Sequence, residues 1–154
     1  MSTHSSFVIE RDYPAPPAKV FAAFSNPAKK GRWFVEGEGF AVDGFDMDFR
    51  VGGLERSRFR FQGSGPLEAG TAIANDTWYC DIVDGERIVC AYVMTVGGAR
   101  ISASLASFEF RAEGHGTRLV FTEQATFFEG ADGPDVREQG WSKLFDRLGD
   151  SLAA

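Results

Sequence analysis

The last part of the chain has the clearest hydrophobic pattern. From Pro134 to Leu152, apolar residues recur at steps of three and four, which predicts a helix with one buried stripe. The stripe consists of Trp141, Leu144, Phe145, Leu148 and Leu152. Pro134 suits the first helical position, and Asp132 is a candidate cap. At about 1.5 Å per residue the helix would be roughly 28 Å long, enough to cross a whole sheet.

The N-terminal part predicts one strand and two short helices. Apolar and polar residues alternate from Phe7 to Tyr13, which is typical of a strand, and a proline cluster follows. Pro16 or Pro17 can open a helix, which Pro27 interrupts because proline removes a helical hydrogen bond. A second short helix is expected from Ala28 to Phe34.

The central part predicts a β-hairpin. Its strands run from Phe45 to Val51 and from Leu54 to Gln62, separated by Gly52-Gly53. A three-residue loop is favoured over a two-residue loop, because it places the apolar residues of both strands on one face: Phe45, Met47, Phe59 and Phe61.

Four further strands are expected from Thr71 onward, separated by Asp84-Gly85, Gly97-Gly98 and Gly114-His115-Gly116. With loops of two, two and four residues, one face of this meander becomes mostly apolar and is the natural partner of the final helix. That face would carry Trp78, Cys80, Ile82, Val89, Ala91, Val93, Ser102, Ser104, Ala106, Phe108, Phe110, Leu119, Phe121, Glu123, Ala125 and Phe127. The opposite face is mixed, which leaves a monomer and a homodimer both open.

Composition narrows the function classes. A net charge of −6 argues against nucleic-acid and anionic-membrane partners, because both would repel the chain without a concentrated basic patch. Arg56, Arg58 and Arg60 alternate along a predicted strand and are interpreted as one solvated face. No apolar run approaches membrane-spanning length and no signal segment is present, so a cytoplasmic location is expected. Fifteen Phe, three Trp and three Tyr can either fill a core or line an apolar pocket.

Several segments, in order along nearly the whole chain, carry a resemblance to a known family. They are Pro14 to Pro27, Arg32-Trp33-Phe34, Phe49 to Gly53, Asp81 to Val89, Gly116 to Leu119, Thr122-Glu123-Gln124 and Gly140 to Leu148. With them the chain resembles the SRPBCC (START and Bet v-like) superfamily and, within it, the Aha-type homologues of the activator of heat-shock-protein ATPase. The resemblance implies a single domain over residues 1–154 with an α+β helix-grip fold: a long curved antiparallel sheet wrapped around a C-terminal helix, with two short N-terminal helices. It also implies binding of a small, largely hydrophobic molecule between sheet and helix.

Glu123 is the sharpest candidate for chemistry. It lies in an otherwise apolar set, so burial should raise the pKa of its carboxyl unless an arginine pairs with it. Ser102 and Ser104 share its face and are candidates for hydrogen bonds to a ligand. Structural roles stay open for all three residues, as a hydrogen-bonded carboxylate and as small packing residues. The proposed ligand-binding set is completed by Trp33, Trp78, Cys80, Val89, Ala91, Phe108, Phe121, Trp141 and Phe145.

Other site types find no support in the sequence. His4 and His115 have no companion ligand at metal spacing, so no metal and no cofactor are expected. Cys80 and Cys90 fall on opposite faces of the predicted sheet, which excludes a disulfide. Three hypotheses follow: a binding protein for a small hydrophobic molecule; a cyclase, dehydratase or hydrolase with Glu123 as acid or base; and a module that interacts with a heat-shock chaperone.

Overall fold

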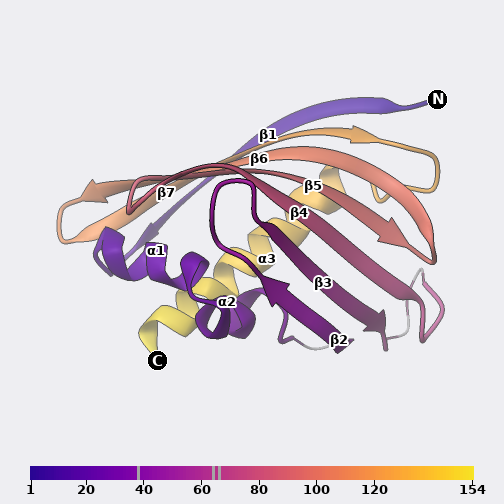
Figure 1. Cartoon of the computed structure of the whole chain (residues 1–154), viewed down its shortest axis with the longest axis horizontal. Helices are drawn as coiled ribbons and strands as arrows, with labels where there is room; N and C mark the ends of the chain where they lie inside the picture. Colours follow the sequence, from indigo (N-terminus) through magenta and orange to yellow (C-terminus); the bar gives the residue numbers. More distant parts are fainter. Residues whose placement is uncertain (38, 64, 66) are drawn as a thin grey trace.

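The computed structural model describes residues 1–37, 39–63, 65 and 67–154. These residues form one antiparallel seven-stranded sheet in the order β1-β7-β6-β5-β4-β3-β2. The sheet curves around α3, and α1 and α2 lie beside that helix on the same side (Figure 1). The elements are β1 (Thr3–Tyr13), α1 (Pro17–Ser25), α2 (Pro27–Phe34), β2 (Phe40–Met47), β3 (Leu54–Phe61), β4 (Ala72–Val83), β5 (Arg87–Val96), β6 (Ala99–Glu113), β7 (Gly116–Phe127) and α3 (Pro134–Ala153).

The three predicted helices are confirmed. Between α1 and α2, the Asn26 side chain accepts a hydrogen bond from the Lys29 amide at 3.1 Å, and Pro27 occupies the first turn of α2. At α3 the proposed Asp132 cap is wrong. Gly133 occupies the N-cap position with a φ of 88°, a conformation that favours glycine. The Asp132 carboxylate binds Arg137 instead.

The expected register between β5 and β6 is wrong. Thr95 pairs with Arg100 and Met94 pairs with Ser102, so Ile101 forms a one-residue β-bulge. A shift of one residue turns β4 and β5 over relative to β6 and β7, because side chains alternate between the faces. Five residues expected in the interior therefore do not face it: Trp78, Cys80, Val89, Ala91 and Val93. The expected two-residue loop at Asp84-Gly85 is also wrong, because Val83 pairs with Arg87. A second irregularity between Tyr79 and Asp81 follows, and Ile82 packs against the core as expected.

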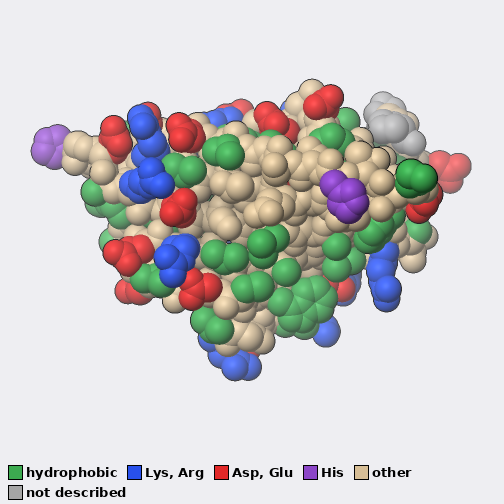
Figure 2. Space-filling model, turned by 90° about the horizontal axis from the view of Figure 1, so that it is seen from above, with side chains coloured by type: hydrophobic (Ala, Val, Ile, Leu, Met, Phe, Trp, Pro, Cys, Tyr) green, Lys and Arg blue, Asp and Glu red, His purple; other side chains and the backbone are tan. Residues whose placement is uncertain are grey.

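The residues that take these interior positions are Tyr79, Cys90 and Tyr92, which are all buried. Trp78 is 46% exposed on the outer face of the sheet. Cys80 is exposed and Cys90 is buried, so the two thiols are free and lie on opposite faces, as predicted. Figure 2 looks down on the outer face and shows hydrophobic side chains among polar ones.

The predicted hairpin exists, and Phe45, Met47, Phe59 and Phe61 all pack toward the core as expected, but its connection spans residues 48–53 instead of three residues. Met47 pairs with Glu55, and Phe45 pairs with Ser57. The connection folds back on β4, where the Gly52 amide donates to the Tyr79 carbonyl at 2.8 Å. Arginines 56, 58 and 60 lie on the outer face, as predicted, where Arg58 pairs with Asp76 at 2.8 Å.

Aromatic rings fill the space between the sheet and α3. Trp141 lies against Phe121, with ring centroids 4.6 Å apart, and against Phe108, at 5.8 Å. Phe145 continues the layer, 5.2 Å from Phe121. The buried stripe of α3 therefore meets the sheet through closely packed rings.

Candidate functional site

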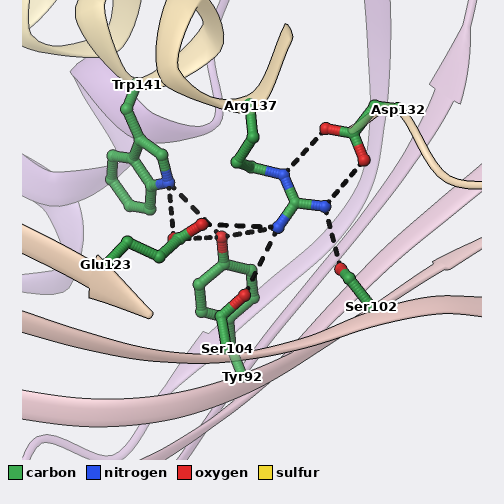
Figure 3. A network of polar contacts seen from close by, with 7 residues as sticks. All are labelled: Tyr92, Ser102, Ser104, Glu123, Asp132, Arg137 and Trp141. Carbon is green, nitrogen blue, oxygen red and sulfur yellow. Dashed lines mark hydrogen bonds and ion pairs between the residues drawn. The ribbon is translucent and has the colours of Figure 1, made fainter. Parts of the chain in front are cut away.

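A buried polar cluster lies among these rings, where the start of α3 crosses the sheet. Figure 3 shows how strands β5, β6 and β7 and helix α3 direct side chains toward one point. Its members are Tyr92, Ser102, Ser104, Glu123, Asp132, Arg137 and Trp141. We refer to these seven residues as the Glu123 centre.

Glu123 is fully buried, and its two carboxylate oxygens have different surroundings. Oε1 accepts hydrogen bonds from the Tyr92 hydroxyl at 2.5 Å and from Nε1 of Trp141 at 3.0 Å. Oε2 has no hydrogen-bond partner among the described residues and lies 3.7 Å from Nη1 of Arg137. Burial raises the pKa of Glu123, while Tyr92 and Arg137 oppose this shift. Burial also raises the pKa of Tyr92, so its hydroxyl stays protonated and acts as a donor.

Arg137 uses all five of its N–H donors inside the centre. Nε and Nη2 bind the two oxygens of Asp132, each at 2.9 Å, in a bidentate arrangement. The other three donors go to the Tyr92 hydroxyl at 3.0 Å, Ser102 Oγ at 2.8 Å and Ser104 Oγ at 3.4 Å. One cation thus faces two carboxylates, those of Glu123 and Asp132.

The structure brings part of the predicted site together. Ser102, Ser104, Glu123 and Trp141 belong to the Glu123 centre, and Phe108, Phe121 and Phe145 pack around it. Trp33 belongs to α2 and is buried against Phe145 of α3, outside the Glu123 centre; its indole donates to the Ala23 carbonyl at 2.8 Å. Trp78, Cys80, Val89 and Ala91 face away from the interior and do not reach the centre.

Sequence reasoning missed Tyr92, Asp132 and Arg137 as members of the centre. Tyr92 alternates with Ala91 and Val93, which the expected register placed inside, so that register put Tyr92 on the opposite, mixed face. Arg137 carried a usable signal, because it precedes Trp141 by four residues and therefore shares the buried stripe of α3. Asp132 could then have been identified as its counter-ion.

A second buried polar cluster, also unpredicted, joins α2 to β3 and β4. Nζ of Lys30 lies 2.7 Å from Oε1 of Glu55, which also accepts a hydrogen bond from the Tyr79 hydroxyl at 2.5 Å. Lys30 and Glu55 are 8% and 1% exposed. Nearby, burial raises the pKa of the Cys90 thiol to about 12, so this cysteine is a poor nucleophile at neutral pH.

Two hollows formed by described residues lie on the surface. The larger, about 540 Å³, runs along the exposed side of α3 and is lined by Asp135, Glu138, Gln139, Ser142, Lys143 and Asp146. The smaller, about 160 Å³, lies beside the end of α3, where Lys19 and Arg32 contribute to its wall. Neither hollow includes a residue of the Glu123 centre.

Two other features are absent from the described part of the chain. Its His, Cys, Asp and Glu side chains form no group of three or more that could hold a metal ion. None of its helices is both long enough and apolar enough to span a membrane.

The curved antiparallel sheet, the long C-terminal helix and the two short N-terminal helices define an α+β protein of the helix-grip type. The chain belongs to the family described as Activator of Hsp90 ATPase homolog 1-like protein, whose model matches residues 14–153. The resemblance seen in the sequence is therefore confirmed. A fold of this kind is consistent with binding of a hydrophobic ligand.

Solved structures agree with this assignment. A protein from Rhizobium leguminosarum is 39% identical, with a TM-score of 0.89 over 99% of this chain and 97% of its own. A protein from Rhizobium loti is 42% identical, with a TM-score of 0.86 over 98% and 99%. An AHSA1-like protein from Aeromonas hydrophila shares the fold at 19% identity, with a TM-score of 0.71 over 97% and 92%. No curated protein sequence matches the chain.

Proposed function

We propose that this protein binds a small, largely apolar organic molecule that donates a hydrogen bond to Glu123. The observation that carries the proposal is Oε2 of Glu123, a fully buried carboxylate oxygen without a hydrogen-bond partner among the described residues. A buried polar group of this kind costs free energy unless something satisfies it. An apolar residue of similar size would pack at this position without that cost.

The chemistry of the centre selects the ligand's polar group. All five donors of Arg137 are engaged, so the arginine has none left for a ligand carboxylate or phosphate. Glu123 Oε2 remains as an acceptor, and two carboxylates face one cation. The centre therefore favours a hydroxyl, an amide N–H or an amine over an anion.

The rings around the centre select the rest of the ligand. Phe108, Phe121 and Trp141 offer faces and edges to a flat apolar body. Because these rings now pack against one another, a ligand must displace them to enter. Trp141 is both a ring of this layer and a donor to Glu123, so its fluorescence should respond to binding.

A pair of matched probes tests the proposal. 2-Naphthol carries a donor, and 2-methoxynaphthalene has the same rings without it. We expect the wild type to bind 2-naphthol about tenfold more tightly, the factor that one hydrogen bond of ordinary strength supplies. The variant Glu123→Met should bind both probes equally, and the surface control Glu10→Gln should behave like the wild type. Failure of the folded wild type to bind either probe, or an unchanged preference in Glu123→Met, would refute the proposal.

An enzymatic role for Glu123 is the second candidate, and its raised pKa supports it. A carboxyl group that titrates nearer to neutral pH is a better general acid or base, and its free oxygen could reach a substrate. This candidate predicts that Glu123→Gln abolishes turnover of a hydrophobic cyclase, dehydratase or hydrolase substrate while leaving its binding intact. Unchanged turnover in Glu123→Gln would exclude it.

A chaperone interaction is the third candidate, and the family match alone supports it. It predicts that the purified protein captures the heat-shock chaperone of its host and stimulates its ATPase. Variants of the buried Glu123 centre that stay folded should then keep this activity, because the chaperone would contact the outer surface.

A further inference from the structure

The inner face of β3 and β4 is polar where the fold would place core residues. β3 presents Glu55 and Ser57 toward the interior, and both are at most 1% exposed. β4 places Thr77 opposite Glu55 and Asn75 opposite Ser57, and the buried Tyr79 follows on the same face. Only at the next inward-facing pair, Phe59 and Ile73, does the face become apolar.

Two atoms of this face have no hydrogen-bond partner among the described residues, Oγ of Ser57 and Oδ1 of Asn75. The two residues are direct cross-strand partners. Their side chains therefore share the inner face, with Cβ atoms about 4.5–5.5 Å apart. Two buried polar atoms without partners side by side, one on the fully buried Ser57 and one on the partly buried Asn75, are unusual, because buried polar groups are nearly always paired.

The residues on either side of this pair either have hydrogen-bond partners or are apolar, so the lack of partners is confined to Ser57 and Asn75. On one side, Glu55 is held by Lys30 and Tyr79. On the other side lies an apolar cluster built from Val35, Phe59 and Ile73, with Phe34, Phe45, Phe61 and Met94 packed against it. Met94 is also the cross-strand partner of Asn75 on β5.

We propose that Ser57 and Asn75 form a second ligand-binding position, for an apolar ring that carries an amide. An amide N–H would donate to Oδ1 of Asn75, and its carbonyl would accept from the Ser57 hydroxyl. The ring would lie against Phe59, Ile73 and Met94. A primary aromatic amide is a small molecule that carries all three groups: the ring, the N–H donor and the carbonyl acceptor.

This position shares no hydrogen-bonding residue with the Glu123 centre, although the two are neighbours. Met94 pairs with Asn75 on β4 and with Ser102, a member of the centre, on β6. Ser57 itself lies on β3 and Glu123 on β7, four strands apart in the sheet. The inference therefore does not rest on the function proposed above, and each can fail alone.

Benzamide and N,N-dimethylbenzamide are the probes that test the second position, since the latter lacks the N–H donor. Binding would be followed in ¹H–¹⁵N correlation spectra of the intact protein, through the Asn75 side-chain amide. We expect benzamide to shift this signal, and Ser57→Ala to weaken its binding about tenfold, as for one lost hydrogen bond. Because the Glu123 centre would also accept an amide N–H, both probes are compared in the Glu123→Met background. There Ser107→Ala, a change in β6 away from this pair, should leave benzamide binding unchanged.

Thermal stability supplies a second readout. Because Ser57 Oγ has no partner, Ser57→Ala should keep or raise the melting temperature of the ligand-free protein. A clear fall in melting temperature would mean that an ordered water holds this hydroxyl in a structural role, and would overturn the proposal. Equal binding of the two probes, or unchanged benzamide binding by Ser57→Ala, would overturn it as well.

Discussion

The indole N–H of Trp141 donates a hydrogen bond to Oε1 of Glu123 at 3.0 Å, joining α3 directly to β7. Both side chains are buried, and the bond sits within the aromatic layer that packs the helix on the sheet. The buried stripe already turns one side of α3 toward the sheet. This directional bond and the contacts of Arg137 add specific polar links between that side and the strands.

Trp141→Phe should destabilise the protein more than Trp33→Phe. Both changes remove an indole from a buried site, but Trp33 donates to the neutral Ala23 carbonyl, whereas Trp141 donates to a carboxylate. Hydrogen bonds to charged groups contribute about 1.5–3 kcal/mol, against about 0.5–1.5 kcal/mol for neutral ones. Urea unfolding followed by circular dichroism gives both free energies. Equal losses of unfolding free energy in the two variants would mean that the hydrogen bond from Trp141 to Glu123 is no stronger than a neutral one.

The pH dependence of stability should reveal the raised pKa of Glu123. Because its pKa in the folded protein lies above the ordinary 4.5, the folded state binds the proton more tightly than the unfolded state does. The carboxyl's contribution to stability is therefore fully present below pH 4.5 and is lost as the pH rises through the folded-state pKa. Glu123→Gln keeps the shape of the protonated form and does not titrate.

The free energy of unfolding of Glu123→Gln minus that of the wild type should accordingly increase with pH above 4.5 and then level off. The difference between the two proteins cancels the titration of the other acidic residues. A difference that decreases with pH would show that Tyr92, Trp141 and Arg137 outweigh burial and stabilise the anion.

Arg137 and Glu123 should be strongly coupled although 3.7 Å separates their nearest charged atoms. Arg137→Gln removes the one cation of the centre and leaves a buried carboxylate unpaired, which typically costs about 3–5 kcal/mol. Adding Glu123→Gln removes that carboxylate, so the double variant should lose less stability than the two single losses predict. The partly exposed pair Arg58 and Asp76, at 2.8 Å, is the control, with an expected coupling below about 1 kcal/mol. Additive effects at Arg137 and Glu123 would contradict this account.

Helix positions could be predicted from the sequence because their signals are local. Proline at the start of each helix and the three- and four-residue steps after Trp141 depend on nothing outside the element. The same periodicity also places Arg137 on the buried stripe, but a charged residue is not expected to be buried, so the pattern of apolar residues did not include it. In β3, Glu55 and Ser57 share the alternation of Phe59, so their burial could also have been inferred.

The register of the sheet could not be predicted from the sequence. The bulge at Ile101 adds one unpaired residue, and no glycine or proline marks it. The loop at Gly97-Gly98 was correct, with Val96 paired to Ala99, yet the pairing beyond Ile101 shifted by one. The expected register therefore placed Ala91 inside instead of Tyr92, and the hydrogen bond between Tyr92 and Glu123 could not be predicted.

The fluorescence of Trp78 can test this register directly. In the structure Trp78 is 46% exposed on the outer face, while Trp33 is fully buried and Trp141 is 8% exposed. We expect acrylamide to quench a substantial part of the wild-type emission, and Trp78→Phe to remove that part. Trp33→Phe, the control, should keep that part of the quenching.

Stability supplies a second test of the register. Because Trp78 lies on the surface, its replacement should change the free energy of unfolding by no more than about 0.5 kcal/mol. In the register without the bulge, Trp78 would pack beneath α3, so Trp78→Phe would leave quenching unchanged and would destabilise the fold as a core substitution does.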